Sequence, residues 1–174
     1  MPNIVLIGSE CSGKTSLAEA LAGYFDIDFL HEYSRQYAES KESELSYKDV
    51  MPIAKGQLKS EKDFIKNTKS RLLIFDTCLL STYIYSKIYY KKVPEKLKYW
   101  LDLNLYDHFY LTFPDPEWKE DGIRKMPMSR LKMHEFFLSE LVRFKVSYSE
   151  LRGDLQSRKE IVIGDLKQYY SAKF

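Results

Sequence analysis

The stretch "NIVLIGSECSGKTSLAEAL", residues 3–21, limits the possible folds of this chain to a small set. An apolar run leads into Gly8 and a loop that ends in Gly13-Lys14-Thr15, which fits the pattern glycine, four residues, Gly-Lys-Ser/Thr. In such a loop successive backbone N–H groups converge on phosphate oxygens, and the dipole of the following helix adds to the attraction. The pattern therefore predicts a phosphate loop between a buried parallel strand and a helix.

The loop also predicts ligands for ATP and Mg²⁺. Lys14 is expected to bridge the β- and γ-phosphates and to act in catalysis, and Thr15 offers a hydroxyl oxygen to Mg²⁺. Asp76 ends the apolar run "RLLIFD", where P-loop proteins place a carboxylate that holds Mg²⁺ directly or through water. We thus predict Thr15 and Asp76 as metal ligands. The predicted ATP-binding residues of the loop are Gly8, Ser9, Glu10, Cys11, Ser12, Gly13, Lys14, Thr15 and Ser16.

Hydrophobic segments alternate between strand and helix patterns along the whole chain. Strands are expected at 3–7, 27–31, 71–76, 107–113 and 145–151. The last segment is ambiguous, because "IVIG" at 161–164 has strand propensity while the apolar spacing favours a helix over 154–171, which we choose. With 174 residues, the chain is predicted to be one α/β domain, 1–174, with a five-stranded parallel sheet and helices on both faces.

Composition excludes several classes of protein. The 27 Lys and Arg residues nearly balance the 25 Asp and Glu residues, so a net charge of +2 gives no argument for a nucleic-acid partner or an anionic membrane. No apolar run approaches the roughly 20 residues that cross a bilayer, and Met1-Pro2 leads directly into a predicted strand without a signal-peptide pattern. We expect a cytoplasmic protein with a small-molecule partner. The sequence does not set the oligomeric state, and a homo-oligomer stays open.

The motifs of other P-loop classes are missing. A GTPase would usually have Asp-x-x-Gly after the third strand and Asn-Lys-x-Asp near the end, whereas Asp76 is followed by "TCLL" and no Asn-Lys pair occurs. A large ATPase motor normally has a longer chain with an added helical domain. A small-molecule kinase with an arginine-bearing lid fits a chain of this length.

Six segments of the chain resemble those of a known family. The segments "GSECSGKTSL", "HEYSRQYAES", "IAKGQ", "LIFDTCLLSTYIYSK", "YDHFYLTFPDPEWKEDGIR" and "RGDLQSR" resemble, in order and spacing, the kinase domain of the bacterial NadR proteins, the ribosylnicotinamide kinases. The resemblance implies a P-loop kinase fold and transfer of the ATP γ-phosphoryl group to the 5'-hydroxyl of nicotinamide riboside. It covers the kinase domain alone, so the expected product is the mononucleotide only. His31 stands where the family tends to have tryptophan, and Cys78 where it often has a second aspartate. Both positions are expected to touch the acceptor, so a kinase for another nucleoside or nucleotide, or an ATP-binding regulatory module, stays open.

The acceptor is expected to lie beyond the second predicted strand. Glu32 is our candidate general base, because nucleoside kinases often place there a carboxylate that accepts the 5'-hydroxyl proton; the alternative is a helix N-cap or an ion-pair partner of Arg35. Arg35 could hold the acceptor or the reacting phosphates, or pair with Glu32 or Glu39. Tyr33 is either a core residue or a contact of the sugar.

Further candidates come from the helices and from the predicted lid. Gln57 interrupts an apolar helical stripe, which suggests a pocket wall or a solvated edge, and Thr82 either reaches the acceptor or bonds its own backbone. Arg124 and Arg130, both in "WKEDGIRKMPMSR", are predicted to stabilise charge during phosphoryl transfer, with ordinary surface charge as the alternative. Gly153 in "RGDLQSR" is expected to allow close approach of the adenine.

The two cysteines are predicted to be reduced thiols, because two are too few for a disulfide framework or a zinc site. Cys11 lies in the phosphate loop and Cys78 follows the third predicted strand, so the two could be close enough for a redox switch.

Overall fold

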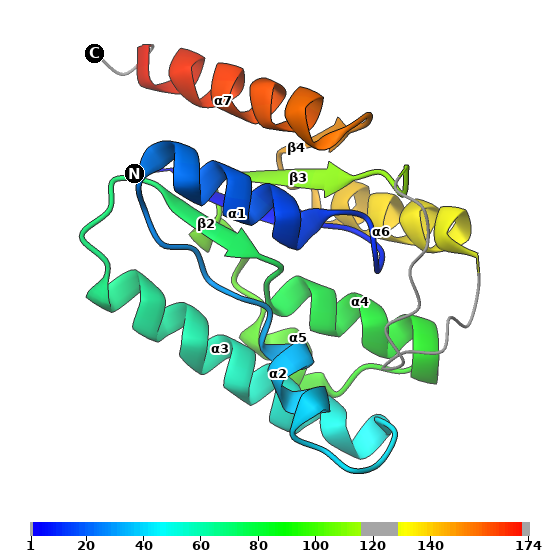
Figure 1. Ribbon diagram of the computed structural model, residues 1–174. Helices are drawn as coiled ribbons and strands as arrows, with labels where there is room; N and C mark the ends of the chain where they lie inside the picture. The colour runs from blue at the N-terminus through cyan, green and yellow to red at the C-terminus, as the bar shows by residue number, and fades with distance from the viewer. Residues whose placement is uncertain (1, 116–128, 172–174) are drawn as a thin grey trace.

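The computed structural model describes residues 2–115 and 129–171 (Figure 1). At its centre is a parallel sheet of four strands in the order β2-β1-β3-β4. The strands are β1 (Asn3–Ile7), β2 (Leu73–Asp76), β3 (His108–Thr112) and β4 (Tyr148–Leu151). β1 is flanked by β2 on one side and by β3 on the other, so the chain first builds the sheet on one side of β1 and then on the opposite side. The carboxyl end of β1 therefore lies at the switch point, where α/β sheets bind their ligands.

Helices cover both faces of this sheet (Figure 1). On one face lie α1 and α7, which contact each other; α3, α4, α5 and α6 cover the other. The helices are α1 (Lys14–Phe25), α2 (Tyr33–Glu39), α3 (Val50–Asn67), α4 (Leu79–Tyr90), α5 (Glu95–Trp100), α6 (Arg130–Phe144) and α7 (Leu155–Ser171), with 3₁₀ turns at Tyr47–Asp49 and Leu103–Leu105. The expected α/β architecture with two covered faces is confirmed.

The central strand explains why its sequence is continuously apolar. Side chains alternate across a strand, so Ile4 and Leu6 pack towards α1 and α7 while Val5 and Ile7 pack towards α3–α6. All four are at most 1% exposed. Burying each such side chain stabilises the fold by about 1.5–3 kcal/mol. The strand thereby anchors the loop that follows it.

The prediction of a fifth strand at 27–31 is wrong, because only one residue of this segment pairs. Leu30 forms a single parallel bridge with Phe75: its N–H donates to Ile74 O (2.9 Å), and its carbonyl accepts from Asp76 N (2.8 Å). Ile27, Phe29 and Leu30 pack against the core in the alternating manner that resembles a strand. On one side of Leu30 the Ile27 N–H still donates to Ala22 O at the end of α1 (3.1 Å), and on the other side α2 begins at Tyr33, so the pairing does not extend beyond Leu30.

The choice of a helix over 154–171 is confirmed, because residues 161–164 lie inside α7. Val162 and Leu166, one turn apart, are buried with Leu17 and Leu21 of α1. Tertiary packing of this stripe outweighs the local strand propensity of "IVIG".

Candidate functional site

The loop after β1 has the conformation that its glycines predict. Gly8 has φ 147° and Gly13 has φ 86°, backbone values that side-chain-bearing residues rarely adopt. A Cβ at Gly8 would lie 2.7 Å from Thr112 Oγ1, so glycine is also needed for the close approach of β3. Inside the loop the Ser12 hydroxyl donates to Ser9 O (2.8 Å) and lies 2.6 Å from Thr112 Oγ1. These contacts fix the curvature of the loop.

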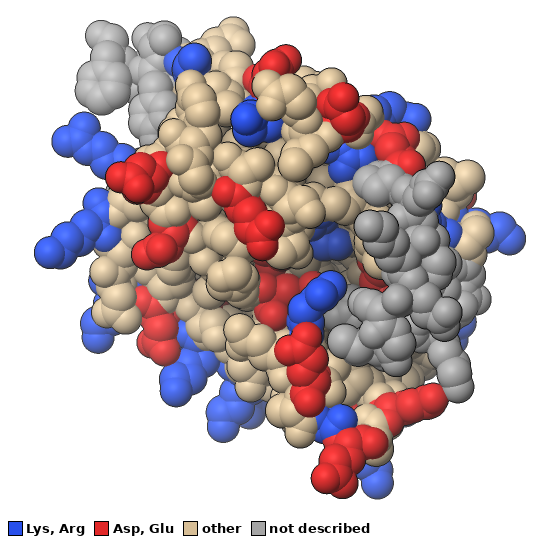
Figure 2. All heavy atoms as spheres, viewed as in Figure 1, with Lys and Arg blue, Asp and Glu red and all other residues tan. Residues whose placement is uncertain are grey.

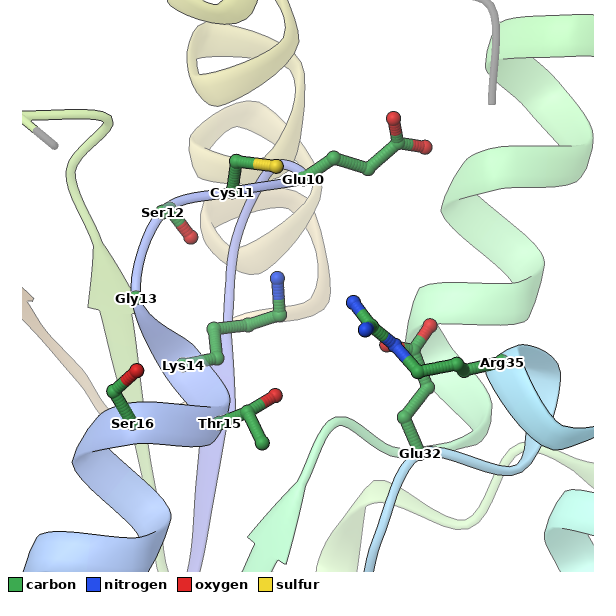
Figure 3. A pocket seen from close by; sticks show the side chains of 9 residues that line it. All are labelled: Glu10, Cys11, Ser12, Gly13, Lys14, Thr15, Ser16, Glu32 and Arg35. Carbon is green, nitrogen blue, oxygen red and sulfur yellow. The ribbon is translucent and has the colours of Figure 1, made fainter. Parts of the chain in front are cut away.

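A cavity of about 240 Å³ lies in front of the loop (Figure 3). The loop and the start of α1 form one wall, and the start of α2 forms the opposite wall. The lining residues are Glu10, Cys11, Ser12, Gly13, Lys14, Thr15, Ser16, Glu32 and Arg35. The structure thus brings together seven of the nine predicted loop residues with two of the predicted acceptor residues. Gly8 and Ser9 are not among these lining residues.

Lys14 extends from the first turn of α1 into the space between the loop and Arg35 (Figure 3). Its ammonium group donates to Ser9 O (2.8 Å) and Gly8 O (3.2 Å), and the side chain is buried. The lysine is therefore held over the concave side of the loop. A point charge in this place suits a phosphate group lying on the loop N–H groups.

Thr15 and Asp76 meet beside the cavity. The Thr15 hydroxyl donates to Asp76 Oδ2 (2.6 Å), while Asp76 Oδ1 is buried and has no hydrogen-bond partner in the described part of the chain. Burial raises the pKa of the Asp76 carboxyl, against the opposing effects of Lys14 and the Thr15 hydrogen bond. A hydroxyl and a carboxylate with an unused oxygen fit a hard cation such as Mg²⁺, which takes one or two protein ligands and phosphate oxygens. Residues 2–115 and 129–171 hold no group of three or more His, Cys, Asp or Glu side chains that could bind a metal alone.

Glu32 and Arg35 face the loop from the start of α2 (Figure 3). Glu32 occupies the N-cap position of α2, but its carboxylate makes no cap hydrogen bond and instead accepts from the Ser34 hydroxyl. Arg35 is exposed. Both charges lie near enough to Asp76 to influence its pKa in opposite directions. The cavity therefore has phosphate-binding groups on one side and an acid–arginine pair of side chains on the other.

The remaining predicted acceptor residues lie outside the cavity lining. Gln57 is 2% exposed, so the solvated-edge interpretation is wrong, and its Oε1 accepts from Tyr33 N (3.2 Å) at the start of α2. Tyr33 packs its ring against α3 at Gly56. His31 is exposed with its ring against Phe29, with centroids 4.2 Å apart. Thr82 is half-buried in α4.

The predicted lid is described only at its borders. Arg124 lies outside the described residues. Arg130 begins α6, and its Nη1 donates to Cys11 O of the phosphate loop (3.1 Å). Gly153, with φ 87°, donates its N–H to Asp115 Oδ2 (2.6 Å), which joins the turn after β4 to the end of β3.

Sequence reasoning missed two buried charged residues near the site. Glu61 lies one helical turn after Gln57 and accepts from its Nε2 (2.9 Å), from Leu79 N (2.8 Å) and from Tyr106 OH (2.9 Å). Burial raises the pKa of Glu61 despite these hydrogen bonds. Arg158 reaches the phosphate loop from α7. The signal for Glu61 was its helical spacing from Gln57, and Arg158 ends the motif "RGDLQSR".

The cysteines do not form a disulfide. Cys78 is 1% exposed, and burial raises the pKa of its thiol. A buried thiol with a raised pKa is a poor nucleophile, which argues against the redox switch with Cys11.

The surface agrees with the balanced composition. Figure 2 shows Lys and Arg side chains mixed with Asp and Glu over the visible face. None of the helices in the described part of the chain combines the length and apolar character that a membrane span requires.

The chain is similar in sequence to known proteins. Two curated relatives, the trifunctional NAD biosynthesis/regulator proteins NadR of Salmonella typhimurium (strain LT2) and Escherichia coli (strain K12), are each 28% identical over 130 residues. The match covers 72% of this chain and 32% of each relative, so the chain spans about a third of their length. The resemblance to NadR that the motifs indicated is confirmed.

Solved structures show the same fold. A NadR protein in complex with NR has a TM-score of 0.76 at 21% identity, over 97% of this chain and 49% of that one. A NadR protein in complex with NAD and AMP-PNP has a TM-score of 0.75 at 22% identity, over the same shares. Deoxyadenosine kinase from M. mycoides, with dCMP and dCDP bound, has a TM-score of 0.64 at 16% identity, over 95% and 99%.

A family model described as AAA domain (AAA_28) matches residues 3–158, which include the phosphate loop, all four strands and the start of α7. This chain therefore belongs to that AAA-domain family of P-loop proteins.

Proposed function

We propose that this protein is an ATP-dependent kinase that phosphorylates the 5'-hydroxyl of nicotinamide riboside. The observation that carries the proposal is the cavity in which Lys14 and the loop face Glu32 and Arg35. A phosphate site opposite a carboxylate and an arginine is the arrangement that transfer of a phosphoryl group to a hydroxyl requires. The NadR protein in complex with NR, and the NadR relatives of similar sequence, supply the identity of the acceptor.

In the proposed reaction the 5'-oxygen attacks the γ-phosphorus of ATP. The bond between the γ-phosphorus and the β–γ bridging oxygen breaks, and its electron pair leaves with ADP. Glu32 accepts the hydroxyl proton, and the ammonium group of Lys14 offsets negative charge on the β- and γ-phosphates. Arg35 and Arg124 of the predicted lid stabilise the charge on the equatorial oxygens. Arg130, which donates to Cys11 O, acts through the backbone of the phosphate loop.

Thr15 and Asp76 would hold Mg²⁺ in this scheme. The unused, buried Asp76 Oδ1 is the ligand that the site offers, and Thr15 is oriented by its hydrogen bond to Oδ2. Bound there, the ion would neutralise phosphate charge and orient the β- and γ-phosphates. The remaining acceptor candidates, His31, Tyr33, Gln57 and Thr82, are proposed to shape the nucleoside side of the site through α2, α3 and α4.

A kinase for another nucleoside is the second candidate. The observation in its favour is His31, which stands where the family tends to have an aromatic that could stack on nicotinamide, and which is exposed against Phe29. The deoxyadenosine kinase similarity shows that the same fold accommodates other nucleosides.

An acceptor panel tests the proposal. ATP consumption with Mg²⁺ is measured with nicotinamide riboside, the common nucleosides, their monophosphates or no acceptor, and product masses are read in parallel. We expect ADP release with nicotinamide riboside and a product heavier by one phosphate. Turnover with another acceptor alone would establish the second candidate, and ATP binding without acceptor-stimulated turnover would contradict a kinase and favour a regulatory module.

A further inference from the structure

A buried arginine on α7, which is not among the residues that line the cavity, donates a hydrogen bond to the backbone of the phosphate loop. Arg158 is 2% exposed and its Nη1 donates to Ser12 O (2.5 Å). Its Nη2 donates to Phe113 O (2.7 Å) and to Asp115 Oδ2 (3.2 Å), in the segment that follows β3. One side chain thus joins the phosphate loop, the end of β3 and α7.

Stability alone explains this arginine poorly. A buried guanidinium loses its hydration, and apolar replacements of buried ion pairs are often neutral or stabilising. The Asp115 side chain is 35% exposed and contacts Arg158 at 3.2 Å, near the long end of hydrogen-bond distances. Arg158 Nε is buried without a hydrogen-bond partner in residues 2–115 and 129–171. The placement therefore suggests that Arg158 sets the orientation of the backbone groups to which it donates.

That role follows from the shape of the peptide group. In a trans peptide the C=O and the N–H of the next residue point in opposite directions. Because Arg158 holds Ser12 O from the α7 side, the N–H of Gly13 is directed away from α7, and Gly13 lines the cavity. Arg130 holds the preceding carbonyl, Cys11 O, in the same way. Two successive loop peptides are thus oriented by arginines outside the cavity.

We propose that Arg158 is a positioning residue for the triphosphate, which fixes the Ser12–Gly13 peptide so that its N–H faces the phosphate. The proposal rests on the proposed binding of ATP to this loop. Arg158 also ties the loop to Asp115, which accepts from Gly153 N and so holds the turn between β4 and α7. Preorganised N–H donors improve phosphate binding because no orientation has to be fixed when the ligand arrives.

The test compares R158M and R158K with a control on the same helix. R158M keeps a side chain of similar length without donors. R158K keeps the charge, but a single compact ammonium cannot bridge Ser12 O and Phe113 O in the fork geometry of arginine. V162A removes buried apolar contact from α7 without touching the loop, and it serves as the control for general destabilisation. For wild type and each variant we would measure the melting temperature, the dissociation constant of AMP-PNP with Mg²⁺ and the dissociation constant of nicotinamide riboside.

We expect R158M to weaken AMP-PNP binding by about tenfold or more and to leave the affinity for nicotinamide riboside within about twofold, with R158K intermediate. V162A should lower the melting temperature without changing either constant. The proposal would be overturned if R158K bound AMP-PNP as tightly as wild type does. It would also be overturned if the Arg158 variants lost affinity for AMP-PNP and for nicotinamide riboside by the same factor. If R158M does not fold, R158K alone decides. Wild-type protein that binds AMP-PNP but phosphorylates no acceptor would contradict the proposed reaction, and the AMP-PNP comparison would still test Arg158.

Discussion

Two carboxylates at this site differ in their surroundings, and this difference separates their proposed roles. Asp76 is 1% exposed, with a raised pKa caused first by burial, and Thr15 donates to one of its oxygens. Glu32 is half-buried at the cavity wall and accepts from the neighbouring Ser34 hydroxyl. A fixed, buried oxygen suits a metal ligand, whereas a carboxylate beside open space suits a proton acceptor.

Glu32→Gln tests the second of these roles. The amide has nearly the same shape but cannot accept the hydroxyl proton, so we expect kcat to fall by about 10²–10⁴-fold. AMP-PNP affinity should stay close to that of wild type, because the loop is untouched. Glu19→Gln, on an exposed position of α1, is the control and should retain wild-type turnover. Wild-type kcat in the Glu32 variant would remove it from the mechanism.

At the scale of elements, α2 is held against α3 by a close contact. A Cβ at Gly56 of α3 would lie only 2.0 Å from Tyr33 Cε1, and the adjacent Gln57 accepts from Tyr33 N. Tyr33 directly follows Glu32. The position of the proposed base therefore depends on a glycine in a different helix.

Gly56→Ala is expected to displace Tyr33 and raise the KM for the acceptor by about tenfold, with less effect on the KM for ATP. Gly164→Ala is a matched control, because that glycine is also in a helix and has open space around it. The control should stabilise the protein by up to about 1 kcal/mol through helix propensity alone. Absence of any change in the Gly56 variant would show that the contact does not position α2.

The connection between α2 and α3 depends on Asp49. Its carboxylate accepts from Lys41 Nζ (2.6 Å), Ser46 N (2.7 Å) and Tyr37 OH (3.0 Å). Burial acts to raise the pKa of Asp49, but these hydrogen bonds outweigh it and hold the pKa well below its usual value. A lowered pKa contributes stability that is present above the unfolded-state pKa and is lost as the pH falls towards the folded-state pKa.

Asp49→Asn is therefore expected to lower the free energy of unfolding by about 1–3 kcal/mol at pH 7. The difference from wild type should shrink as the pH falls below about 4, where the unfolded carboxyl protonates. Urea unfolding at pH 7 and at progressively lower pH measures this difference in the free energy of unfolding. Asp63→Asn, at an exposed position of α3, is the control. A difference independent of pH would mean that the ionised carboxylate is not the stabilising form.

At the scale of the whole molecule, two hydrophobic clusters share one sheet. The cluster beneath α1 and α7 and the cluster beneath α3–α6 both include side chains of β1, β2 and β3, which alternate between the two faces. Loss of either helical layer would expose one face of the strands whose opposite face supports the other layer. We expect the two layers to unfold together.

Unfolding should accordingly be a single transition that the nucleotide shifts. Saturation with AMP-PNP and Mg²⁺ at about 100 times the dissociation constant should add about 2.7 kcal/mol to the free energy of unfolding. Chelation of Mg²⁺ should reduce this gain if Thr15 and Asp76 hold the ion. Calorimetry with and without EDTA measures both effects. Two separate transitions would contradict the prediction of one domain.

The sequence determined the phosphate loop, because a glycine-bracketed pattern after an apolar strand specifies backbone geometry locally. It also determined the alternation of strands and helices, and the helical spacing over 154–171 correctly outweighed the strand propensity of "IVIG". The packed fold was needed to show that 27–31 pairs through Leu30 alone, that Gln57 accepts from Tyr33 N and does not face solvent, and that Arg158 donates to Ser12 O of the loop. Hydrophobic periodicity encodes which face of an element is buried, whereas the partner of a buried polar group depends on distant segments that meet only when the chain is packed.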